Sequence, residues 1–366
     1  MTTQFARKTG LNCVACHAAP PKLNAKGEAF LARGYRMSSE TADGKPFKTI
    51  DPLPVAVWVT GRHEEQMDKG YGDTFVPKVE LISGGPIGNA FSYFVEWRVV
   101  SLSAQPDGTL QDRGGRFEDA FINWDFANGH ALRAGQFRAL GQYDVSRRLS
   151  VSEPILMSGS LSGDPSSNTR IQSLGAFSPS GRSPGVAYTY QSMGGALPSD
   201  GLFHTMTLPW VGEFSLPLST EAQEEASFEL DPSLKGVFLE TFYRLGVSSV
   251  GSHAFIDDDR WLFGGLGLFN IGDVYTTAGL GLDGGDNFPT RKRYSAEVEW
   301  LPSWFDRFRP GIGARAEHIS EISNEPAVIP YMVLIGPNTF YTFVLQGEGR
   351  FQEGSNAVIL DLSAVF

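Results

Sequence analysis

The chain has little of what holds most other folds together. Only two of its 366 residues are cysteine, which excludes a disulfide-rich scaffold and a zinc site built from two cysteine pairs. No stretch reaches about 18 consecutive apolar residues, which excludes a membrane-spanning helix. Charged residues are scarce, at 19%. In their place stand 42 glycines, 26 phenylalanines and 12% aromatic residues, a composition that favours β-strands joined by turns.

Charge is unevenly divided along the chain. Residues 1–48 hold eight basic and three acidic side chains, a balance of +5, whereas the rest hold 22 basic and 38 acidic side chains, or −16. A cationic segment joined to an anionic body favours docking of one on the other. Acidic loops that merely keep a surface soluble would give the same totals. No basic, aromatic-rich stretch indicates binding to nucleic acid.

Both cysteines fall in one motif, Cys13-Val14-Ala15-Cys16-His17. Two thiols three residues apart are placed to form thioethers with the vinyl groups of one haem, and the next histidine can bind the iron as proximal ligand. A thioredoxin-like redox pair would stand beside a βαβ pattern, which is missing here. A disulfide between Cys13 and Cys16 would close too short a loop to stabilise the chain. The motif therefore predicts one covalently attached haem c.

The residues around the motif, 1–48, are predicted to form a small haem segment. Asn24 suits the N-cap of a short helix ending near Arg33, and Gly34 suits the position just beyond it. A segment of under about 50 residues cannot both cover a haem and stabilise itself, so it has to lean on the rest of the chain. The apolar side chains available to line its haem pocket are Phe5, Leu11, Leu23, Phe30 and Tyr35.

From about Leu53 onward the sequence alternates with the period of β-strands. Residues 55–60, 91–99 and 119–126 each set apolar or aromatic side chains against polar ones. A soluble sandwich would alternate too, so the connections are the better guide. Short turns alternate with longer polar links, as in outer-membrane barrels. The longer links are predicted at 62–75, 102–115, 139–185, 212–235, 257–259, 283–292, 319–326 and 352–355.

The predicted fold is an all-β transmembrane antiparallel barrel over residues 49–366, with sixteen strands, or fourteen if the strand before Asp257 is absent. The last strand supports this, because Val358, Leu360 and Leu362 alternate with polar residues and Phe366 is an aromatic C-terminus. We expect a bacterial outer-membrane protein with both termini periplasmic and residues 1–48 plugging the lumen. The first residues show no apolar signal-peptide core, so we expect a removed signal peptide.

Further residues around the motif carry a resemblance. The sequence FARKTG (5–10) leads into the motif, and Pro21, Leu23, Gly27, Phe30 and Gly34-Tyr35 follow it as P-x-L-x3-G-x2-F-x3-G-Y. The chain thus resembles the fused monohaem cytochrome–porins of the bacterial outer membrane, whose best-known members oxidise extracellular ferrous iron. The block LRAGQF (132–137), late in the fifth predicted strand, is also similar to that family. The close match covers roughly the first 35 residues and this block, and the chain is short for the family.

The resemblance implies an oxidoreductase that relays electrons across the outer membrane. A hydrocarbon layer of about 30 Å separates donor and acceptor, so the haem has to lie within the height of the barrel wall. The expected donor is extracellular, ferrous iron first, and the expected acceptor is a periplasmic c-type cytochrome. Two alternatives stay open: a haem-containing porin for solute transport or redox-gated binding, and a soluble periplasmic haem protein with a β-sandwich.

The second axial ligand of the iron is left open. Met37 comes 20 residues after His17, and His/Met ligation raises the potential of a haem, although an ordinary apolar methionine would look the same. His63 and Met67, in the first predicted outer loop, are the alternatives. The other histidines, at 130, 204, 253 and 318, are expected to be turn or lumen side chains. The acidic links 212–235 and 257–259 offer hard oxygen ligands for passing iron, or only solvated charge.

Overall fold

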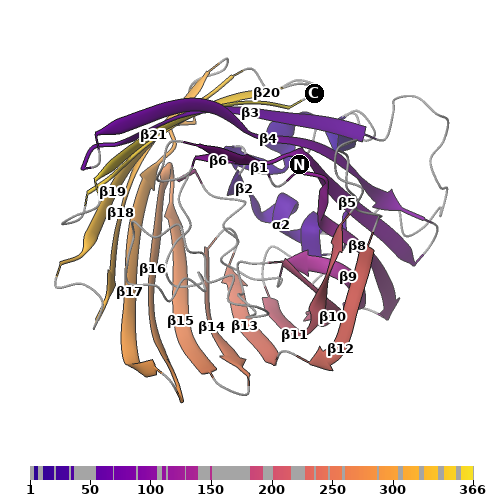
Figure 1. Cartoon of the computed structure of the whole chain (residues 1–366). Coiled ribbons are helices and arrows are strands. Elements are labelled where there is room, and N and C mark those ends of the chain that lie inside the picture. The colour runs from indigo at the N-terminus through magenta and orange to yellow at the C-terminus, as the bar shows by residue number, and fades with distance from the viewer. Residues whose placement is uncertain are drawn as a thin grey trace.

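The computed structural model describes residues 4–6, 11–19, 22–32, 34–36, 55–68, 70–87, 90–104, 109–112, 114–127, 129–138, 149–150, 182–192, 201–215, 227–234, 236–245, 248–257, 260–286, 288–303, 308–320, 325–336, 342–351 and 356–365. Most of them form a closed antiparallel β-barrel, with the N-terminal helix inside the ring of strands (Figure 1). Among these residues, no helix is long and apolar enough to cross a membrane.

The cylinder is built from strands that pair in sequence order, and the last strand closes it on the first. They are β3 (Val55–Gln66), β4 (Tyr71–Pro86), β5 (Phe91–Val100), β8 (Arg116–Ala127), β9 (His130–Arg138), β10 (Arg182–Gln191), β11 (Gly201–Ser215), β13 (Val237–Leu245), β14 (Ser248–Ile256), β15 (Arg260–Ile271), β16 (Val274–Gly285), β17 (Phe288–Trp300), β18 (Arg309–Ile319), β19 (Ala327–Ile335), β20 (Thr342–Arg350) and β21 (Ala357–Val365).

One further strand pairs with the wall without belonging to the cylinder. β12 (Ser227–Leu234) pairs with the far half of β11, while residues 201–207 of β11 pair directly with β13. The cylinder therefore has the sixteen predicted strands, and the strand before Asp257 is present as β14. A separate hairpin, β6 (Leu102–Ala104) with β7 (Leu110–Asp112), stands within the connection from β5 to β8.

The two faces of each strand show which medium surrounds the barrel. On β17 the outward Tyr294, Val298 and Trp300 are exposed, whereas the inward Arg293 and Glu299 are buried. On β21, Val358, Leu360 and Leu362 are exposed outward, as predicted, and Asp361 is turned inward and buried. Apolar side chains outside and charged ones inside are the reverse of a soluble protein and are typical of a transmembrane barrel. Strand closure leaves no unpaired edge to the lipid.

The charged side chains of the lumen wall are mostly paired with each other. Arg291 and Arg293 both contact Asp283, at 2.5 and 2.8 Å, and all three are buried. Arg62 holds Asp361 across the closing strand pair at 2.7 Å. Such pairs let a wall that turns its charges inward remain compact, because a buried charge without a partner is strongly destabilising.

We call the end of the barrel at which β3 begins and β21 ends the proximal end, and the opposite end the distal end.

The predicted alternation of turn lengths is only partly confirmed. Predicted links 62–75 and 283–292 are wrong: β3 runs to Gln66, β4 begins at Tyr71, β16 ends at Gly285 and β17 begins at Phe288. Half of 212–235 belongs to β11 and β12. Polar residues at the distal rim continue the strands because pairing satisfies their backbone groups.

Two residues of the long connection from β9 to β10 lie on the far wall of the lumen. Leu149 is 1% exposed and packs with Ile329, Val333 and Val344, the inward side chains of β19 and β20. Ser150 accepts a hydrogen bond from Arg315 Nη1 at 2.6 Å, and the carbonyl oxygen of Leu149 accepts one from Gln346 at 2.7 Å. At these two residues the connection lies inside the barrel.

Candidate functional site

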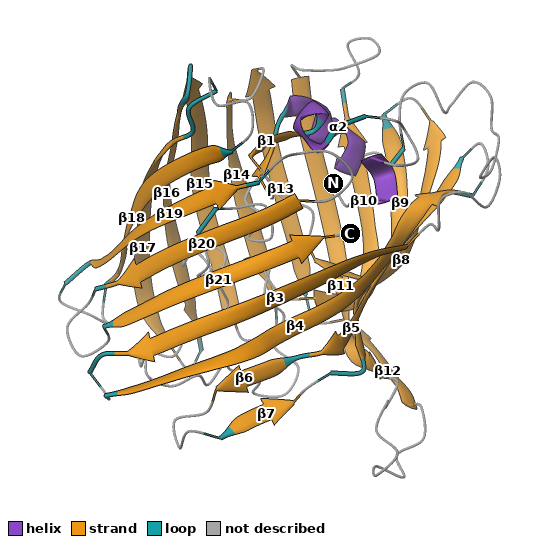
Figure 2. Ribbon diagram, turned by 90° about the horizontal axis from the view of Figure 1, so that it is seen from above, coloured by secondary structure: helices purple, strands orange, loops and turns teal. Residues whose placement is uncertain are grey.

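The predicted haem segment forms short elements inside the barrel. These are η1 (Cys13–Ala15), β1 (His17–Ala19), β2 (Lys22–Leu23) and α2 (Ala25–Ala32). β1 and β2 form a hairpin in which His17 pairs with Leu23, and Ala19 with Lys22. Figure 2 shows α2 near one end of the barrel, on the side where the C-terminus lies. The predicted helix is confirmed, within a residue at its end.

The ends of α2 follow the predicted capping chemistry. The side chain of Asn24 accepts a hydrogen bond from the backbone N–H of Gly27 at 3.1 Å, as an N-cap does. At the other end Gly34 has φ +63°, and the N–H groups of Gly34 and Tyr35 donate to Leu31 and Phe30 at 3.0 and 2.8 Å. This pair of bonds is the Schellman arrangement, which glycine favours because it has no Cβ.

The motif residues are gathered and shielded from solvent. Cys13 is 1% exposed, Cys16 0% and His17 4%. Both cysteines are free thiols, and burial raises the pKa of each. A raised pKa disfavours a redox-active cysteine pair, which needs an accessible thiolate. The N-terminus of α2 sits directly on this turn: a Cβ on Gly27 would lie 2.1 Å from the carbonyl oxygen of Cys16, so only glycine fits there.

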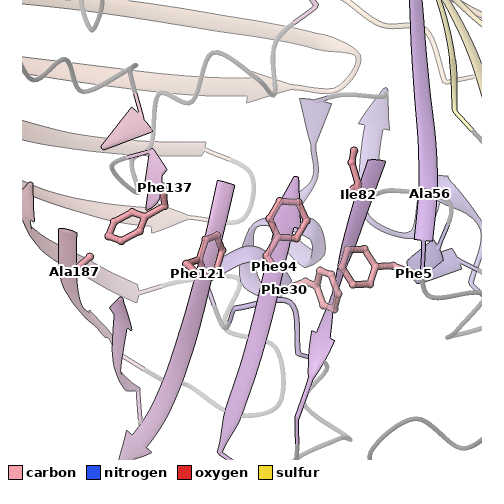
Figure 3. Close-up of a cluster of buried hydrophobic side chains, with 8 residues drawn as sticks. All are labelled: Phe5, Phe30, Ala56, Ile82, Phe94, Phe121, Phe137 and Ala187. Carbon is pink, nitrogen blue, oxygen red and sulfur yellow. The ribbon is translucent and has the colours of Figure 1, made fainter. Parts of the chain in front are cut away.

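Three of the five predicted pocket residues form one aromatic cluster against the barrel wall. Phe5 and Phe30 are in edge-to-face contact at 5.0 Å, and Tyr35 stacks on Phe5 at 5.4 Å. Tyr35 also stacks on Phe94 of β5 at 4.3 Å. Figure 3 shows Phe5 and Phe30 beside the wall side chains Ala56, Ile82, Phe94, Phe121, Phe137 and Ala187 of the same buried cluster. Leu11 and Leu23 are half-buried.

Polar contacts hold the segment to four barrel strands. Lys22 pairs with Glu299 of β17, and Arg309 of β18 donates to the carbonyl oxygen of Ala18 at 2.9 Å. On the helix side, Arg36, 1% exposed, contacts Asp125 of β8 at 3.5 Å, and Arg244 of β13 contacts Glu28 at 3.6 Å. The contacts of Lys22 and Arg36 agree with the predicted docking of a basic segment on acidic side chains of the barrel. In the other two contacts the cation is an arginine of the barrel.

Of the three candidates for the second axial ligand, the two that the structure describes, His63 and Met67, lie away from the motif. Met37 lies outside the described residues. His63 is on the outward face of β3, exposed, with Nδ1 2.9 Å from the Thr74 hydroxyl. It is seven residues from Ala56, which touches the Phe5 cluster, so about 23 Å along the strand separates them. Met67 is 54% exposed in the distal turn.

The acidic links are only partly visible. Residues 216–226, 258 and 259 lie outside the described residues. Asp257 is paired with Arg260 at 2.9 Å. Over the part of the chain that the structure describes, no three His, Cys, Asp or Glu side chains are grouped so as to hold a metal ion.

Sequence reasoning missed the wall partners of the segment. Glu299, Arg309 and Asp125 sit at the proximal ends of their strands and turn inward, but only the closed barrel places those ends around one segment. The one available signal was the opposite charge of the two parts of the chain, which indicates attraction without identifying a residue.

Comparison with known proteins identifies the class of the barrel. No protein-family model and no curated protein matches the chain. Among solved structures, Salmonella typhi OmpF in complex with daunomycin superposes with a TM-score of 0.51 at 12% identity, over 85% of this chain and 97% of that one. An anion-selective porin from Comamonas acidovorans gives 0.51 at 10% identity, over 85% and 98%. The protein therefore has the fold of the outer-membrane porins; at these identities the likeness concerns the fold alone.

Proposed function

We propose that this protein is a haem-carrying porin of the bacterial outer membrane that relays electrons from an extracellular donor, ferrous iron first, to a periplasmic c-type cytochrome. The observation that carries the proposal is the burial of Cys13, Cys16 and His17 inside a transmembrane barrel. It also agrees with the resemblance of the first 35 or so residues to the fused cytochrome–porins.

The residues present fit a haem c. Cys13 and Cys16 are free thiols at the spacing of its two vinyl groups, and His17 supplies an imidazole next to them. When bound, haem supplies one-electron redox chemistry that protein side chains lack. The chain's own part is to hold the thiols and the imidazole together in η1 and at the start of β1, and to keep all three buried.

The position of the segment bears on the choice of donor. Its polar contacts fall at the proximal ends of β8, β13, β17 and β18. We assign the proximal end to the periplasm, where a soluble cytochrome can approach. β17 has 13 residues, which span about 43 Å along the strand, so the motif lies far from the distal rim. A donor from the distal side has to enter the lumen, which favours an ion or small molecule over a mineral or a protein.

Thiol labelling of the purified protein tests the cofactor. We expect the denatured protein to show a covalent haem spectrum and no maleimide labelling with or without a reductant, because thioethers consume both thiols. A Cys13→Ser, Cys16→Ser control should show neither haem nor labelling. Two labelled thiols in the denatured wild type would overturn the haem proposal, and labelling only after reduction would indicate a disulfide instead.

Proteoliposomes test the relay. Ferrous iron is added outside vesicles that contain oxidised mitochondrial-type cytochrome c, and reduction of the enclosed cytochrome is followed by absorbance. We expect reduction with the wild type and none with the Cys13→Ser, Cys16→Ser control. Haem-loaded protein that reduces nothing under these conditions would refute the relay.

The barrel favours a second candidate, passage of small solutes. The porin fold supports this candidate directly and lends no support to electron transfer. Swelling of the same vesicles in isotonic sugar measures it. Sugar flux that is equal in the wild type and the thiol-free control, without cytochrome reduction, would make solute transport the function.

A further inference from the structure

The hairpin that carries His17 is held by two neighbouring barrel strands. Arg309, the first residue of β18, donates from Nη1 to the carbonyl oxygen of Ala18 at 2.9 Å. Glu299, the last residue but one of β17, accepts from Lys22 Nζ. Ala18 follows His17 directly, and Lys22 pairs with Ala19 across the hairpin. The two contacts therefore fix both strands of the hairpin within two residues of the imidazole.

The wall side of this clamp is itself rigid. Glu299 is 2% exposed, and its Oε1 lies 3.0 Å from the hydroxyl of the buried Tyr331. The same hydroxyl lies 2.7 Å from Oε1 of Glu297. Lys22 Nζ lies 4.5 Å from the ring centroid of Tyr275, which flanks it from β16. A carboxylate whose second oxygen is engaged has little rotamer freedom, and a charged hydrogen bond in a shielded place is stronger than one in water.

The hairpin cannot hold its own geometry. β1 has three residues and β2 two, joined by an irregular register, and an isolated two-stranded hairpin is marginal even when longer. Two further polar contacts of the segment, from Arg36 and Glu28, are longer, at 3.5 and 3.6 Å, and lie on or beyond α2. The contacts from β17 and β18 fall on the hairpin itself.

We propose that Glu299 and Arg309 are positioning residues that set the place of the His17 imidazole and thereby its bond to the haem iron. This inference rests on the proposed haem. The barrel then does more than shelter the segment, because two wall side chains determine how firmly the proximal ligand is held. Residues that only anchored the segment would change its mobility as a whole and leave the iron ligation as it is.

The test compares variants on the two sides of the segment in the purified, haem-loaded protein. Arg309→Met and Glu299→Gln weaken the hairpin clamp; Arg244→Met removes the contact to Glu28 and serves as the matched control. We expect all three to keep one covalent haem and a folded barrel, checked by heat-shifted migration on SDS gels. We expect the ratio of five- to six-coordinate nitric oxide complex, read by EPR of the ferrous protein, to rise about tenfold or more in the hairpin variants. Nitric oxide weakens the iron bond opposite to it, and a lost charged hydrogen bond holds the imidazole less firmly by about that factor. Arg244→Met should match the wild type.

A rescue and a second readout complete the test. Arg309→Lys keeps a cationic donor and should recover much of the wild-type ratio of five- to six-coordinate nitric oxide complex. Amide exchange of residues 17–23 should rise in the hairpin variants and not in Arg244→Met, and it can be followed without haem in the thiol-free background. An equal ratio of five- to six-coordinate nitric oxide complex in the hairpin variants and the wild type, or an equal rise in Arg244→Met, would overturn the positioning role while the haem proposal stood. A wild type without haem would overturn the proposed function; unchanged exchange in the thiol-free background would then overturn the clamp as well.

Discussion

Gly34 is the position at which the seating of the N-terminal segment can be tested most directly. Its φ is +63°, and a Cβ placed on it would lie 2.6–2.7 Å from side-chain atoms of Asn123 on β8. Gly34→Ala therefore carries two penalties. The left-handed backbone costs an alanine about 1–2 kcal/mol, and overpacking against a well-packed wall costs about 1–3 kcal/mol more. The sum, about 2–5 kcal/mol, lowers the ratio of seated to unseated segment by about 30- to 4,000-fold.

The assay is proteolysis of the segment in the folded, detergent-solubilised barrel, because cleavage follows the population of the open form. We expect Gly34→Ala to be cleaved faster by about the factor above. Adding Asn123→Ala to Gly34→Ala removes the steric clash. The double variant should then be cleaved only about 5- to 30-fold faster than the wild type, which is the effect of the backbone penalty alone. Gly70→Ala, at φ +64° with nothing within 4 Å of its Cβ, supplies the same backbone penalty in a distal turn and should leave the segment protected. A Gly34→Ala segment cleaved at the wild-type rate would refute the seating described here.

Three further predictions concern the barrel. Asp283→Asn leaves Arg291 and Arg293 buried without their carboxylate and should lower the unfolding free energy in denaturant titrations by about 3–5 kcal/mol; a change under about 1 kcal/mol contradicts the pairing. Leu149→Ala removes a side chain that is 1% exposed and should release its connection from the far wall at a cost of about 2–5 kcal/mol, seen as faster cleavage between β9 and β10. Hydrogen bonds from Asn356 lower the pKa of Asp68 below its usual 3.8, so this carboxylate stabilises the distal rim at and above that pH and the benefit disappears as the pH falls through the lowered pKa. The thermal unfolding midpoint should therefore decrease less steeply with falling pH in Asp68→Asn than in the wild type. An equal decrease in both proteins would exclude Asp68 as the cause of this pH dependence.

The parts of the structure that follow from local chemistry could be predicted. The alternation of Val358, Leu360 and Leu362 with Asp361 determines which face of β21 meets lipid, whatever the rest of the chain does. Asn24 and Gly34 bracket α2 because a cap needs only a side-chain acceptor at one end and a residue without Cβ at the other. The strand count could be predicted for the same reason, since most turns carry their own signals.

The remaining features depend on where the barrel closes. Glu299 and Asp125 are 174 residues apart, and nothing near either in sequence marks it as a partner of residues 22–36. The loop predicted at 62–75 was wrong because polar residues such as His63 and Thr74 are typical of loops, although here they pair with each other within β3 and β4. Polarity reports contact with water, and strands that rise above the lipid are wetted on both faces.

The depth at which the two sulfur atoms lie imposes an order on biogenesis. With Cys13 1% and Cys16 0% exposed, an enzyme reaches neither sulfur atom while the segment is seated. Any enzymatic modification of these thiols therefore has to precede seating, or wait until the segment leaves the wall. The stability of the seat, and not closure of the strands alone, sets the time that is available for maturation.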